Sequence, residues 1–152
     1  PPPSADLVDC PAGVCVSGTG SNGGTLYTYT VPPSDHPTSG LYEGACFDST
    51  PGNELVVQID VTGFSQIAAT TCNTASGETD SAIVVLDGPA DIGLPVELGC
   101  NEDRGPGDFC AQVDPTALPA GVNTVWVVID EWELATFWDS TFDKTIDIEL
   151  IP

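Results

Sequence analysis

The chain has 152 residues, 41% of them apolar, and its 23 acidic and two basic side chains give a formal net charge of −21. This length suits a single domain with its own core, and the apolar content excludes a disordered acidic tail. The charge argues against nucleic acids and anionic membrane surfaces as partners, and it favours hard cations such as calcium.

The N-terminal residues 1–6 read PPPSAD, a stiff sequence of the kind that forms a linker or an N-terminal arm. We therefore divide the chain into this arm and one domain over residues 7–152. The glycine-rich residues 17–24 predict a flexible turn. The β-branched and aromatic residues 26–31 predict a strand that ends at two prolines.

Residues 54–61 show the clearest strand pattern, because apolar and polar side chains alternate along them with the period of a half-buried strand. A short turn at residues 62–64 returns the chain as a second strand over residues 66–71. The two segments together predict an antiparallel pair.

Residues 82–87 and 124–130 are continuous apolar runs, which indicate central strands covered on both faces. Shorter strands are expected at residues 96–100 and 109–113. The helix-like residues 131–137 are too few to change the fold class.

Residues 145–151 predict a final strand with an apolar face and an acidic face. The apolar face comprises Ile146, Ile148 and Leu150, and the acidic face Asp147 and Glu149. Together, eight or nine short strands punctuated by 16 glycines and 14 prolines predict an all-β protein, a jelly-roll-like antiparallel β-sandwich.

Six cysteines form an even set without a C-x-x-C pair or a cysteine–histidine cluster suited to zinc, so we expect disulfides. Disulfides imply an oxidising compartment, and we expect a secreted or cell-surface piece of an exported protein without a membrane span. Proximity in the chain predicts three bonds: Cys10–Cys15, Cys46–Cys72 and Cys100–Cys110.

From Cys46 to the C-terminus, the order of motifs is specific. The segment 79–88 reads TDSAIVVLDG, and the segment 97–103 reads ELGCNED, followed by LPAG and the apolar run VWVVID. This order resembles the bacterial pre-peptidase C-terminal (PPC) domain family. The sequence departs from the family pattern at Glu102, where the family usually has aspartate, and in a longer segment before the last strand.

The resemblance implies a jelly-roll sandwich that is appended to secreted proteases and other exported proteins and is usually non-catalytic. It identifies no ligand. Consistent with this, the single histidine, His36, lies between an aspartate and a proline and has no G-x-S-x-G serine to partner, so we do not expect an enzyme.

An acidic turn offers a candidate calcium site, because calcium takes six to eight oxygen ligands, roughly. The alternative is a solvated turn whose side chains cap backbone amides. The candidate ligands are Asp80, Asn101, Glu102, Asp103, Asp108 and Asp130.

Three aromatic residues before the last strand, Trp132, Phe137 and Trp138, are candidates for stacking on sugar rings. The alternative is that they cover one end of the sandwich and are buried there. A carbohydrate-binding module is therefore one possible function.

A different function follows from the N-terminal arm. The arm could carry residues 7–16 to a neighbouring copy and add them as a strand to an exposed sheet edge. Repeated head-to-tail, this contact builds an extracellular filament or surface layer. The partners would then be copies of the same chain, whereas an accessory module would contact other domains of its parent protein.

Overall fold

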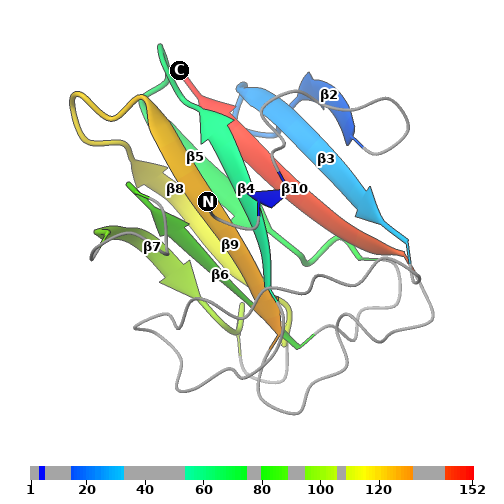
Figure 1. Cartoon of the computed structure of the whole chain (residues 1–152). Coiled ribbons are helices and arrows are strands. Elements are labelled where there is room, and N and C mark those ends of the chain that lie inside the picture. The colour runs from blue at the N-terminus through cyan, green and yellow to red at the C-terminus, as the bar shows by residue number, and fades with distance from the viewer. Residues whose placement is uncertain are drawn as a thin grey trace.

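A computed structural model describes residues 4–5, 15–32, 54–74, 80–88, 95–105, 109–131 and 143–152, with the backbone alone for residues 4, 5 and 15–17. The described residues are all strands, turns and loops, and they form two sheets packed face to face (Figure 1). The predicted all-β sandwich is confirmed.

Each sheet has five strands. The first sheet contains, in spatial order, β1 (Ser4–Ala5), β4 (Glu54–Asp60), β9 (Thr124–Glu131), β6 (Ser81–Leu86) and β7 (Glu97–Asn101). The second contains β2 (Cys15–Thr19), β3 (Thr25–Val31), β10 (Lys144–Ile151), β5 (Gln66–Thr70) and β8 (Gln112–Ala117). In Figure 1, β9 lies between β4 and β6, and β10 lies between β3 and β5.

The topology is that of a jelly roll. We count β3 to β10 as strands 1 to 8. The first sheet then has the order 2-7-4-5 and the second the order 1-8-3-6, which is the arrangement of two Greek keys. Their pairings are antiparallel. The short strands β1 and β2 extend one edge of each sheet, β1 in parallel to β4 and β2 antiparallel to β3.

The main core lies between the sheets, where alternate residues of every long strand point inward. Val57 and Ile59 of β4 meet Ile146 and Ile148 of β10 in one buried cluster, and all four are at most 1% exposed. At roughly 25 cal/mol per Å² of apolar surface, such burial is the largest favourable contribution to folding. The alternation read from the sequence therefore places the core correctly.

The strands β6 and β9 are buried on both faces, as their continuous apolar runs predict. All six residues of β6 are buried. On the face turned away from the main core, Val84 and Leu86 pack with Val56 and Val128 in a second apolar cluster. The first sheet is therefore buried on this face as well as on the face towards the main core.

The expected strand at residues 109–113 is wrong in position, because β8 begins three residues later, at Gln112, and continues through Pro115. Proline removes a hydrogen-bond donor and is tolerated in a strand at a sheet edge. Since β8 is the edge strand of the second sheet, Pro115 fits there. The pair Asp114-Pro115 is typical of a turn, so the sequence did not predict a strand through it.

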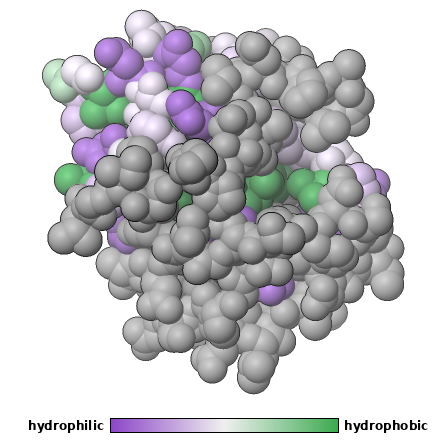
Figure 2. Space-filling model, viewed as in Figure 1, coloured by the Kyte–Doolittle hydropathy of each residue, from purple (hydrophilic) through white to green (hydrophobic). Residues whose placement is uncertain are grey.

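The glycine-rich segment 17–24 is only partly a turn, because residues 17–19 belong to β2. The turn itself spans residues 20–24, and Gly23 has φ of 79°. In Figure 2, the coloured residues at the upper left are mostly hydrophilic or intermediate, with isolated hydrophobic ones between them. This is the surface expected for so acidic a chain.

Candidate functional site

The most specific motif residues lie together where β6 and β7 pair, at the end of the sandwich that also holds the end of β5. Ile83 is opposite Asn101 in this antiparallel pair. The Ser81 and Thr71 hydroxyl oxygens are 2.8 Å apart, and the Thr71 hydroxyl also accepts a bond from the Ala111 amide, at 3.0 Å. Thr71 and Ser81 are both fully buried.

Asn101 has a similar role. Its Oδ1 accepts a hydrogen bond of 2.9 Å from the backbone amide of Gln112 in β8. Asn101 belongs to the first sheet, and Gln112 to the second. The motif side chains Ser81 and Asn101 therefore connect the two sheets through hydrogen bonds to groups beside β5 and β8.

A disulfide joins Cys72, just after β5, to Cys110, just before β8, with Cα atoms 5.0 Å apart. The predicted pairs Cys46–Cys72 and Cys100–Cys110 are therefore wrong. The register of the two strands explains the error. Thr70 of β5 is opposite Gln112 of β8. Two positions beyond this antiparallel pair, Cys72 comes opposite Cys110. Strand pairing, rather than distance along the chain, selected the partners.

Cys100 is also disulfide-bonded, and it packs against the second apolar cluster. The predicted pair Cys10–Cys15 lies outside the residues whose side chains the structure describes. The Cys72–Cys110 bond indicates an oxidising, extracellular-type environment. Within the described part of the chain, no helix has the length and apolar character needed to cross a membrane.

Three of the candidate calcium ligands line one small pocket of about 140 Å³: Asp80, Glu102 and Asp103, with Phe109. Burial, together with the charge of Asp103, raises the pKa of the Asp80 carboxyl. This is the direction expected for a partly buried carboxyl beside a second carboxylate.

The other candidate ligands lie differently. Asn101 is turned towards β8, and Asp130 is wholly buried in β9, where its Oδ1 accepts a bond of 2.8 Å from the Glu131 amide. Asp108 lies outside the described residues. Among the residues described, no group of three His, Cys, Asp or Glu side chains is arranged to hold a metal ion.

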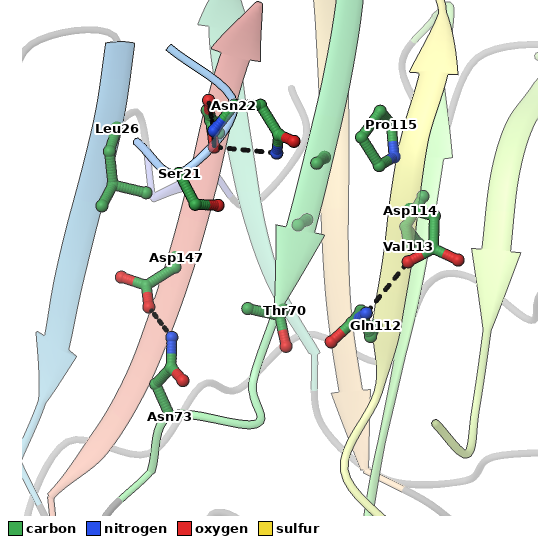
Figure 3. A pocket seen from close by; sticks show the side chains of 13 residues that line it. Ser21, Asn22, Leu26, Thr70, Asn73, Gln112, Val113, Asp114, Pro115 and Asp147 are labelled. Carbon is green, nitrogen blue, oxygen red and sulfur yellow. Dashed lines mark hydrogen bonds between the residues drawn. The ribbon is translucent and has the colours of Figure 1, made fainter. Parts of the chain in front are cut away.

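The candidate sugar-stacking residues Trp132, Phe137 and Trp138 also lie outside the described residues, as does His36. The structure instead reveals a larger hollow that the sequence did not predict. It is a groove of about 480 Å³ on the face of the second sheet that points away from the main core (Figure 3). We call it the second-sheet groove.

The second-sheet groove is lined by side chains from four strands or the loops beside them. Its polar groups come from the β2–β3 turn, from β5 and the residues after it, from β8 and from the acidic face of β10: Ser21, Asn22, Thr70, Asn73, Gln112, Asp114, Asp147 and Glu149. Leu26, Ala68 and Pro115 add apolar surface. The hollow exists because β5 carries small side chains at this place. Ala68, which lies directly opposite Glu149 in the sheet, is one of them.

Two buried carboxylates organise the floor of the groove. Glu149, 5% exposed, accepts hydrogen bonds from the Asn22 amide at 3.1 Å, from Asn22 Nδ2 at 3.2 Å and from the Gly24 amide at 3.0 Å. Asp147, 8% exposed, accepts from the Thr28 hydroxyl at 2.6 Å and from Asn73 Nδ2. These neutral donors satisfy both buried charges.

The turn that covers Glu149 requires glycine at position 24. A Cβ there would lie 2.0 Å from the carbonyl oxygen of Leu150, which is backbone and cannot move aside. The glycine therefore lets the β2–β3 turn approach β10 closely enough for its amides to reach Glu149.

The sequence carried one signal of this site, the acidic face of the last strand. Its other lining residues come from segments far apart in the chain. No protein-family model matches this chain, and neither does any curated protein.

Proposed function

We propose that this chain is a non-catalytic, secreted module of an exported bacterial protein, similar to PPC domains, with an accessory or adhesive role. Other domains of the parent protein and the surface or substrate it meets would be its partners. The proposal treats the chain as a stable carrier of binding surface.

The observation that supports the proposal is that the motif residues Ser81 and Asn101 make hydrogen bonds that connect the two sheets. The Ser81 hydroxyl is hydrogen-bonded to the Thr71 hydroxyl, and Asn101 Oδ1 accepts a hydrogen bond from the Gln112 backbone amide. Groups that act in chemistry must reach a substrate, whereas Ser81 is fully buried. The resemblance to a non-catalytic family thus rests on residues whose work is structural, next to a disulfide that strengthens the same end of the sandwich.

Retention on insoluble material tests the adhesive role. The purified, oxidised chain is incubated with insoluble polysaccharides, bacterial cell walls and fibrous protein, and both the bound fraction and any released product are measured. Retention on at least one material without turnover supports the proposal. Turnover of a material, or no retention on any of them, contradicts it.

A second candidate function, the filament subunit, is favoured by the pairing of β1. Ser4 and Ala5 of the N-terminal arm pair in parallel with Val56 and Val57 at the edge of β4. This edge therefore accepts an added strand, and in the part of the chain that the structure describes the paired arm spans two residues against the seven of β4. In a filament, the arm of one copy would occupy the β4 edge of the next.

The structure narrows the donor segment expected for such a filament. Cys15 and Val16 belong to β2 and pair with Tyr29 and Thr28 of the same chain. The donor strand would therefore come from residues before Cys15. Negative-stain microscopy of the full chain and of a variant lacking residues 1–6 tests the idea: fibres in the first preparation alone support it, and isolated particles in both contradict it.

A further inference from the structure

We infer that the second-sheet groove binds a neutral oligosaccharide. This inference rests on the proposed adhesive function and gives it a ligand class and a site. The site differs from the aromatic segment, residues 132–138, in which the sequence placed sugar binding.

The size and position of the groove suit a small polar ligand. Its volume of about 480 Å³ lies within the range of roughly 300–1,000 Å³ typical of small-molecule sites. The β-sheet beneath it forms a rigid floor, because Asp147 and Glu149 belong to β10, which is hydrogen-bonded to strands on both sides. A preformed site loses little entropy when a ligand binds.

Three amide side chains around the groove are oriented in the same sense. Asn22 donates through Nδ2 to Glu149, Asn73 donates to Asp147, and Gln112 donates through Nε2 to Asp114 at 2.9 Å (Figure 3). Because each NH₂ group is directed at a carboxylate, each amide carbonyl oxygen is directed away from it. The amide oxygens and the carboxylates thus give the groove several acceptors, beside the Ser21 and Thr70 hydroxyls, and this set favours a ligand with several donors.

The charge of the groove selects further. Asp114, Asp147 and Glu149 line it, and its described lining includes no lysine, arginine or histidine. Anionic ligands such as phosphates, uronates and sulfated sugars would meet uncompensated repulsion there. A neutral sugar supplies several hydroxyl donors without this repulsion.

The apolar part of the groove provides the remaining contact. Leu26 and Pro115 lie on opposite sides of it (Figure 3). Ala68 belongs to β5, which lies between their strands β3 and β8 in the sheet. A pyranose ring has C–H faces that pack against such side chains while its hydroxyls reach the polar rim. Since no aromatic side chain lines the described groove, dissociation constants on the order of 0.1–1 mM are expected.

Backbone amide NMR of the oxidised chain tests the inference with defined probes. The neutral probes are oligosaccharides of glucose, mannose, xylose and N-acetylglucosamine, and the charged probes are polygalacturonate fragments and spermidine. Saturable shifts that map to residues 21–26, 68–73, 112–114 and 147–149 with a neutral probe support the inference. Shifts that map elsewhere, binding of a charged probe alone, or no binding overturn it.

Two variants with a matched control locate the site. Ala68→Trp fills the groove and is expected to weaken binding at least tenfold. Gln66→Trp places the same side chain two residues away on the same face of β5, outside the groove lining, and is expected to change binding less than twofold. Gln112→Ala, which removes an acceptor without adding bulk, is expected to weaken binding about 3- to 10-fold.

Melting curves of each variant establish that it is folded, and the Gln112→Ala result stands if Ala68→Trp does not fold. Equal binding by the wild type, Ala68→Trp and Gln112→Ala would overturn the inference. If Ala68→Trp is still retained on insoluble material while soluble sugars do not bind the groove, the groove assignment fails and the proposed adhesive function stands.

Discussion

The two outer faces of the sandwich differ sharply. Val84 of β6 and Val128 of β9, on the face of the first sheet away from the main core, are fully buried in an apolar cluster. The corresponding face of the second sheet carries Asp147, Glu149 and a polar groove. The first face is stabilised by non-directional burial, and the second by directed hydrogen bonds and a disulfide beside it.

The difference shows which sequence pattern indicates an apolar outer face and which indicates a polar one. A strand covered on both faces has a continuous apolar run, as β6 and β9 do. A strand whose second face is polar alternates apolar and charged residues, as β10 does from Ile146 to Glu149, even though both of its faces are buried. Four experiments test this comparison, from the largest expected effect to the smallest.

A charge placed on each face should have very different consequences. Val128→Asp puts a carboxylate into a fully buried apolar cluster, and we expect a loss of about 4 kcal/mol or more in unfolding free energy, or no folded protein. Gln66→Asp puts the same group on the polar face, with an expected loss below about 1 kcal/mol. Denaturant unfolding measures both, and similar losses would refute the contrast.

Loss of the Cys72–Cys110 disulfide should affect the second sheet most. The bond closes a loop across 38 residues of separation, and removing such a bond costs about 3–4 kcal/mol through the entropy of the unfolded chain. We expect Cys72→Ala with Cys110→Ala to speed hydrogen exchange in β5 and β8 more than in β6 and β9. Uniform acceleration in both sheets would show that the bond supports the whole fold equally.

The interior shared by both sheets provides a reference through Tyr29. Burial, with a smaller contribution from Tyr27, raises the pKa of Tyr29 from 10.0 to about 12. As pH rises above 10, the unfolded chain ionises first, so this contribution to stability, present below pH 10, is lost as pH rises towards 12. The loss amounts to about 2–3 kcal/mol.

Tyr29→Phe retains the buried ring and removes the ionisable hydroxyl. Unfolding free energies measured from pH 8 to pH 12 should fall less steeply for this variant than for the wild type. Parallel pH profiles would show that Tyr29 does not control alkaline unfolding.

The smallest effect concerns Asp80, at the polar margin of the first sheet. Its raised pKa means that the carboxylate form opposes folding, and that stability is lost as pH rises through the folded pKa. We expect Asp80→Asn to raise the melting temperature slightly at pH 7, with a gain in stability well under about 1 kcal/mol, because Asp80 is only partly buried and solvent screens its charge.

The same variant tests the calcium proposal for the turn that contains Asp80, Glu102 and Asp103. If calcium binds there, adding it in place of a chelator raises the melting temperature of the wild type more than that of Asp80→Asn. Identical melting temperatures of the wild type in calcium and in chelator would end the proposal.

Most strands could be predicted from the sequence, because their periods follow directly from burial. Residues 54–60 and 144–151 form strands as expected and turn their alternate apolar side chains into the main core, and residues 81–86 form the expected doubly buried strand. The prediction for β8 was displaced because proline, here Pro115, is typical of turns. A strand tolerates proline at the edge of a sheet, and only the topology shows that β8 is an edge strand.

The sites were less predictable because they depend on register. Cys72 meets Cys110 since β5 pairs with β8, a pairing that crosses from the third to the sixth strand of the jelly roll. The second-sheet groove depends likewise on Ala68 lying opposite Glu149. No local pattern encodes such contacts, whereas the crowding of Asp80 with Glu102 and Asp103 followed from the motif order.

Strand β10 is the last of the described strands in sequence order, yet it lies in the middle of the second sheet, hydrogen-bonded to β3 and β5. Neither neighbour can complete its pairing until β10 has been added, and Glu149 fixes a turn 127 residues earlier in the chain. The second sheet therefore cannot be completed before residues 144–151 have joined it. The pairing of β10 with β3 connects segments far apart in the sequence, and such long-range contacts form slowly during folding.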